Sequence, residues 1–146
     1  MSRGRRDDEG TIVFLTLGLA LVLMAMVVVV VDVSVVVLAK RNVANAADGA
    51  ALVAAQQPDA RVLNDRRDAL NRRLPLDARA VVRVVADYQR EEAARQPSLT
   101  MSASVAGGTE AVVQARRTVR LPFVSWFGVR NVVVRATGRA RSPVIA

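Results

Sequence analysis

The chain has 146 residues, about the length of one domain, and its 21 basic and 13 acidic residues give a net charge of +8. It contains neither Cys nor His, which excludes disulfides, thiol and imidazole catalysis, and the usual zinc sites. All but one of the basic residues are arginine. Such a surface attracts polyanions. However, an arginine-rich, lysine-poor composition is also common in proteins encoded by GC-rich genomes.

Residues 11–31 form a run of 21 uncharged, mostly aliphatic residues. At 1.5 Å per residue, a helix of this length crosses the ~30 Å hydrocarbon core of a bilayer. A lone strand in lipid would leave its backbone unpaired, so the valine-rich run is predicted to be helical. We therefore expect a transmembrane helix at residues 11–38, preceded by a cytoplasmic segment at 1–10. The alternative is a signal peptide cleaved near Ala39, but its apolar region would span only about 7 to 15 residues.

The charges that flank this run predict its orientation. Arg3, Arg5 and Arg6 precede it, whereas Lys40 and Arg41 follow it. This small excess favours a cytoplasmic N-terminus in the plasma (inner) membrane and a C-terminal domain outside the cytoplasm.

Asp32 is the ionisable residue within the predicted membrane segment. Two interpretations stay open: lipid headgroups solvate the carboxylate near the interface, or it pairs with a basic or backbone group of a partner helix.

The helix is predicted to continue outside the membrane through residues 39–57. Ala44, Ala47, Ala51 and Ala54 recur at helical spacing, and Pro58 ends the pattern. A stripe of small side chains allows another helix to approach closely, unless alanine is merely abundant here.

Residues 58–146 are expected to form an extracytoplasmic α+β domain. The segment 59–74 suits a short amphipathic helix, and Asp77 is a predicted N-cap for a second helix that ends before Pro97. In that second helix one face is predicted to hold Val81, Val82, Val85 and Tyr88. A strand over 81–85 is the alternative.

From Ser98 the apolar period changes to two, which predicts strands. The expected strands are 99–105, 111–121 and 131–138, with Gly107-Gly108 as the turn between the first two. The predicted fold class is therefore α+β and pilin-like: a long N-terminal helix, one or two short helices and a small three-stranded antiparallel sheet.

No motif for catalysis, a cofactor or a metal is found. Gly107-Gly108 lacks the lysine and helix of a phosphate-binding loop, and Glu91-Glu92 lies on a predicted solvated face among arginines. We therefore expect no enzyme, no cofactor and no small-molecule substrate. Phe123, Trp126 and Phe127 form an aromatic cluster that either closes the end of the sheet or makes an exposed interface.

The N-terminal third resembles a known family. The order RRDDEG at residues 5–10, a long aliphatic run, VDVS at 31–34 and KRNVANAADGAALVAA at 40–55 is similar to the start of the TadE/TadG-like pilus-assembly proteins. The resemblance assigns Asp32 to the family's aspartate, and Asn45, Ala47, Asp48 and Ala51 to its alanine-rich signature. It implies a non-catalytic subunit of the Tad system, which builds Flp (type IVb) pili, with other pilus-assembly or pilin-like subunits as partners of the N-terminal helix.

The sequence departs from the processed members of that family. These carry a glutamate five residues after the glycine at which they are cleaved, whereas Leu15 stands five residues after Gly10. This favours an uncleaved, TadG-like anchor, and Gly10 remains only a candidate processing site. The alternative function is a tethered binding module whose arginine-rich sheet, including Arg135 and Arg139, holds acidic envelope polymers; nucleic acid is not expected outside the cytoplasm.

Overall fold

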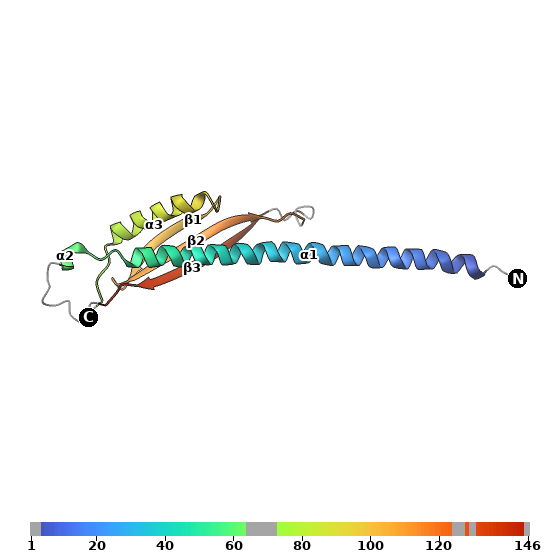
Figure 1. The fold of residues 1–146 in the computed structure, drawn as a ribbon, viewed down its shortest axis with the longest axis horizontal. Coiled ribbons are helices and arrows are strands. Elements are labelled where there is room, and N and C mark those ends of the chain that lie inside the picture. Colours follow the sequence, from blue (N-terminus) through green and yellow to red (C-terminus); the bar gives the residue numbers. More distant parts are fainter. Residues whose placement is uncertain (1–3, 64–72, 124–127, 129–130, 145–146) are drawn as a thin grey trace.

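The computed structural model describes residues 4–63, 73–123, 128 and 131–144, and its dominant element is one long helix. Helix α1 runs without a break over Gly4–Ala55, a length of 52 residues. It extends far beyond the rest of the fold, which gathers around its C-terminal half (Figure 1). The prediction that the helix of the apolar run continues unbroken to about Ala55 is confirmed.

The three predicted strands form one antiparallel sheet in the order β1-β2-β3. Their bounds are Thr100–Ala106 for β1, Glu110–Arg120 for β2 and Asn131–Arg141 for β3. Gly107 and Gly108, with φ of 57° and 74°, make the predicted turn between β1 and β2, a left-handed conformation that glycine adopts without steric cost. The third strand is longer than the sequence indicated, because β3 pairs with β2 from Asn131 as far as Arg141.

Helix α3 spans Ala78–Ala93 and begins at the predicted cap. Oδ1 of Asp77 accepts hydrogen bonds from the backbone N–H groups of Arg79 (2.8 Å) and Ala80 (3.2 Å). The bonds from Ala80 and Arg79 lower the pKa of the Asp77 carboxyl below its ordinary value of 3.8, because they favour the charged form. The strand alternative for 81–85 is wrong.

The buried face of α3 is narrower than predicted. Val81 and Val85 are buried, as expected, but Val82 is 51% exposed. The helix predicted over 59–74 appears as α2, Ala60–Leu63, and the remainder of that prediction falls mainly on residues 64–72, outside the described residues.

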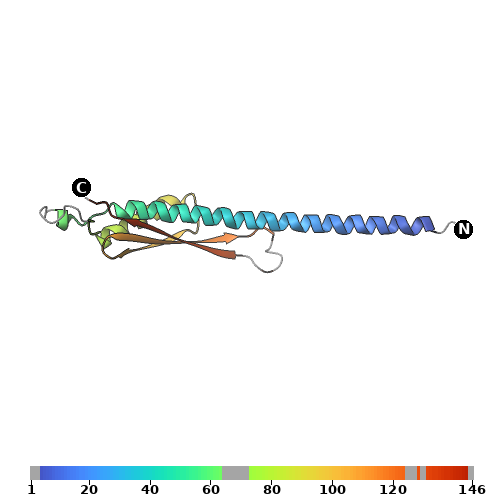
Figure 2. The same ribbon diagram turned by 90° about the horizontal axis from the view of Figure 1, so that it is seen from below.

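The core lies between the helices and one face of the sheet. Helix α1 contacts β2 and β3, and α3 contacts β1 and α1. Figure 2 shows the sheet on one side of α1, and in the described part of the chain no helix covers the sheet's other face. Small side chains dominate the buried layer, among them Ala50, Ala54, Ala111 and Ala115, so the helix lies close to the strands.

Candidate membrane and subunit interface

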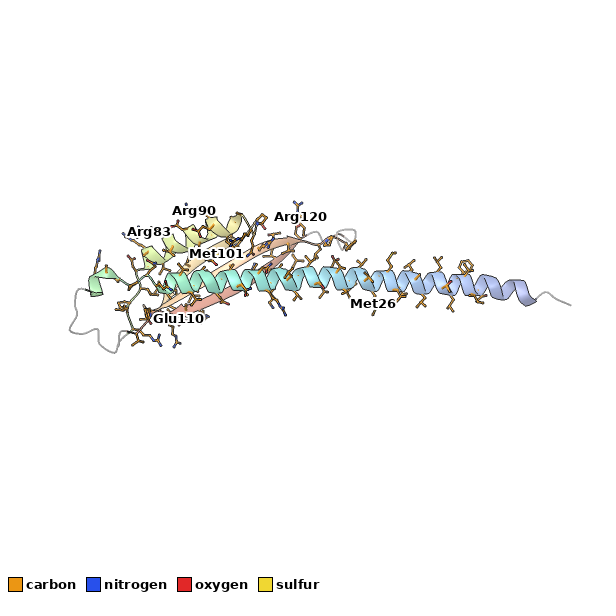
Figure 3. The ribbon with its side chains drawn as sticks, viewed as in Figure 1. Met26, Arg83, Arg90, Met101, Glu110 and Arg120 are labelled. Carbon is orange, nitrogen blue, oxygen red and sulfur yellow. The ribbon has the colours of Figure 1, made fainter. Side chains whose placement is uncertain are left out.

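The N-terminal part of α1 is an apolar rod that the domain leaves uncovered. A window within Thr11–Ala55 reaches a mean hydropathy of 3.0, and only 6% of that window is buried. Large aliphatic side chains are exposed all around the rod, for example Leu15 at 73% and Met26 at 66% (Figure 3). Exposed apolar surface on this scale calls for a lipid or protein partner, because water disfavours it. Among the described residues, this is one helix suited in length and composition to cross a membrane.

Asp32 lies where the uncovered rod ends. The residue is 4% exposed, and its Oδ1 accepts a hydrogen bond from the backbone N–H of Phe123 at 3.4 Å. Sequence reasoning offered headgroups or a partner helix as its surroundings. The structure adds a contact within the same chain, to the segment that follows β2, a partner 91 residues away that no local pattern could indicate.

The domain covers α1 from this point onward. Ala39 and Val43 are buried in a cluster that also includes Val134 of β3, with Val35 and Val36 packed against it. One side of the helix segment 32–38, which was assigned to the membrane with residues 11–31, therefore contacts the sheet.

The alanine stripe is filled from within the same chain. Ala47 and Ala51 have no exposed surface, and Ala46 and Ala55 are nearly as buried. The sequence led us to expect the helix of another subunit here. The sheet and α3 occupy this place instead, because side chains this small let strands approach as closely as helices.

Asn45 and Asp48 are exposed on the helix, unlike the alanines of the same signature. They alternate with Arg41 and Leu52 at spacings of three and four residues, so all four side chains share one face of α1. Leu52 is 60% exposed. Because the domain does not cover this face, Asn45 and Asp48 are accessible to a partner and Ala47 and Ala51 are not.

The aromatic cluster is described only at its first residue. Phe123 is 47% exposed beside the bond to Asp32, so at this residue the cluster is a partly open surface rather than closed core. Trp126 and Phe127 lie outside the described residues. Gly10 lies within α1, and nothing in the fold tests whether the chain is cleaved after it.

Sequence reasoning missed a polar cluster between the helices and β2. Gln96 is 7% exposed; its Nε2 donates to Glu92 Oε1 (2.9 Å) and to the Asn42 carbonyl (3.5 Å), and its Oε1 accepts from Arg117 Nη1 (3.4 Å). Arg117 belongs to the inward face because it alternates with Ala115 and Val119. The period-two pattern of β2 could have revealed this inward arginine, but no sequence signal identifies Gln96 as its acceptor.

The described residues contain no group of three or more Asp, Glu, Cys or His that could hold a metal ion. Residues 10–57 match the Flp pilus-assembly TadE/G-like family. The TadE/G-like segment comprises nearly all of the uncovered rod, Asp32 and the buried alanine stripe. No curated protein and no solved structure gave a significant match.

Proposed function

We propose that the chain is a non-catalytic subunit of a Tad/Flp pilus-assembly system, anchored in the plasma (inner) membrane by the first part of α1. The observation that carries this proposal is the uncovered apolar rod within the TadE/G-like segment, which protrudes from the α+β domain (Figure 1). A rod of this kind serves to embed the protein in lipid and to meet the helices of other subunits.

The hydrogen bond of Asp32 supports an outer boundary of the proposed membrane span just before this residue. Residues 11–31 make a helix of about 31 Å, close to the ~30 Å hydrocarbon thickness. A carboxylate at the bilayer centre would cost ~2.5 to 3.5 kcal/mol, and this cost falls toward the interface. We therefore place residues 11–31 in lipid and Asp32 at the surface, under the segment that begins at Phe123.

We infer the surfaces for partner subunits from the same geometry. Within the bilayer the partners would meet residues 11–31, whose side chains point outward in all directions. Outside it they would meet the helix face that carries Asn45 and Asp48. Ala47 and Ala51 serve the subunit's own fold.

Because the sequence contains no cysteine, single introduced cysteines can be labelled selectively to test the topology. Single cysteines would be introduced at Ser2 and at Ser104, the latter exposed on β1. An impermeant maleimide should label S104C in intact spheroplasts and S2C only after lysis. Labelling of S2C in intact cells would overturn the proposed orientation, and recovery of the chain in the soluble fraction would overturn the anchor.

The pilus role is tested in the native host by the amount of pilin that shearing releases. The double variant N45K/D48K places two positive charges on the exposed face of α1. It should reduce the pilus yield while the protein stays at normal abundance in the membrane. A matched control, R83E on the exposed side of α3, should leave the yield unchanged (Figure 3). Normal piliation in a deletion strain would refute the proposal.

A further inference from the structure

The uncovered face of the sheet carries a concentration of positive charge that pilus anchoring does not explain. The pairing register brings Arg116 and Arg135 directly opposite each other on β2 and β3. Cβ atoms of such a pair lie about 4.5 to 5.5 Å apart, and like charges in this position repel. Arg120, Arg139 and Arg141 point to the same side of the sheet, as the exposure pattern of the strands shows. A bound anion would therefore stabilise this face by reducing the repulsion between the arginines.

The arginines border a trough rather than a flat surface. Two adjoining hollows of about 330 Å³ and 320 Å³ share Thr100, Arg116 and Arg135. Arg116 is steadied in the trough by a hydrogen bond of 3.0 Å from its Nε to Thr100 Oγ1. Small polar side chains make up most of the remaining outward lining: Ser98, Ser102, Gln114, Thr118 and Thr137.

Acidic side chains offer almost no neutralisation on this face. Among the described residues, the strands contribute Glu110 alone, and its Oε2 is paired with Arg141 Nε at 3.7 Å. The two arginines of the trough have no carboxylate partner in the described part of the chain. Their charges are thus available to a ligand.

We propose that this trough binds a carboxylated polysaccharide chain, with Arg116 and Arg135 gripping its carboxylates. Guanidinium groups form charge-assisted, often bidentate hydrogen bonds with carboxylates, and the surrounding hydroxyl and amide groups suit the hydroxyls of a sugar. Two hollows in a row along the strands suit a chain of sugar units better than a single small molecule. This inference is independent of the proposed pilus role.

Other occupants fit less well. A second copy would bring its own net charge of +8 to a face that is already positive. Single-stranded nucleic acid binds by stacking its bases on aromatic rings, and the described residues of this face include none. A bilayer that encloses the first part of α1 would lie across the helix axis, whereas the sheet runs alongside α1 (Figure 2).

Binding of the detergent-solubilised full chain to polygalacturonate tests the proposal. Methyl-esterified polygalacturonate, which has the same backbone without the charge, is the ligand control, and a DNA duplex is a second arm. The R116Q/R135Q variant should bind polygalacturonate about tenfold or more weakly, because charge-assisted hydrogen bonds are lost. The control variant R83Q/R90Q removes the same charge from α3 and should retain native affinity (Figure 3).

Unchanged thermal unfolding of both variants would show that the exposed substitutions leave the fold intact. Equal losses in the two variants would overturn the proposal in favour of a general charge effect. Equal binding of the esterified polymer, or tighter binding of DNA, would also overturn it.

Discussion

Gly138 on β3 lies directly against the backbone of Ala47 on α1. A Cβ atom at Gly138 would overlap the Ala47 carbonyl and would lie 2.7 Å from the backbone nitrogen of Asp48. The obstacle is helix backbone, which cannot swing aside as a flexible side chain can. This contact fixes how closely the sheet approaches the TadE/G-like segment and leaves Ala47 without exposed surface.

The first prediction follows from this contact. G138A should destabilise the domain by about 1 to 3 kcal/mol, the usual cost of overpacking, because α1 and β3 would have to separate. Thermal unfolding of the full chain in detergent, followed by circular dichroism, measures the change. G18A is the matched control, since a Cβ at Gly18 meets nothing within 4 Å. If G138A unfolds at the same temperature as the native protein, the close approach of β3 to α1 is contradicted.

The sequence allowed the elements to be predicted, but not how they pack together. Apolar length, the cap at Asp77 and the alternation from Ser98 are local signals, and they correctly predicted α1, α3 and the three strands. The surroundings of Asp32 and Ala47 depend on residues far along the chain, Phe123 and Gly138, which no local period connects. The alanine stripe was therefore assigned to a partner helix, because small residues indicate close packing without indicating against what.

The second prediction concerns the bond between Asp32 and Phe123. In D32A the Phe123 amide loses a charged acceptor, and its hydrogen exchange should accelerate about tenfold, as expected for a bond worth roughly 1.5 kcal/mol. D32N retains a side-chain oxygen and should keep much of the protection. S34A is the control, since the exposed Ser34 hydroxyl donates to the Val30 carbonyl of its own helix. If the Phe123 amide exchanges at the same rate in D32A and in the native protein, both in nanodiscs, the contact between Asp32 and Phe123 is refuted.

The third prediction is a pH dependence at the start of α3. Because the folded state lowers the pKa of Asp77, its charged form stabilises the fold above the ordinary value of 3.8, and this contribution disappears as the pH falls through the lower folded value. D77N keeps a capping oxygen but cannot titrate. The stability difference between the native protein and D77N should therefore shrink between about pH 6 and about pH 2 in urea unfolding. A difference that stays constant across this range would show that the cap does not depend on the charge.

The last prediction concerns the buried contact between Gln96 and Arg117, and compares the loss of stability when one residue is replaced with the loss when both are replaced. In Q96L, Arg117 loses the oxygen that accepts from its Nη1, while its buried Nε already has no hydrogen-bond partner among the described residues. The loss of this hydrogen-bond acceptor should lower the free energy of unfolding by about 1 to 3 kcal/mol. Replacing both residues in Q96L/R117M removes the need for a partner and fills the space with apolar atoms, so much of the lost stability should return. A double-mutant cycle by urea unfolding measures this coupling, and simple additivity of the two single changes would mean that Gln96 does not support Arg117.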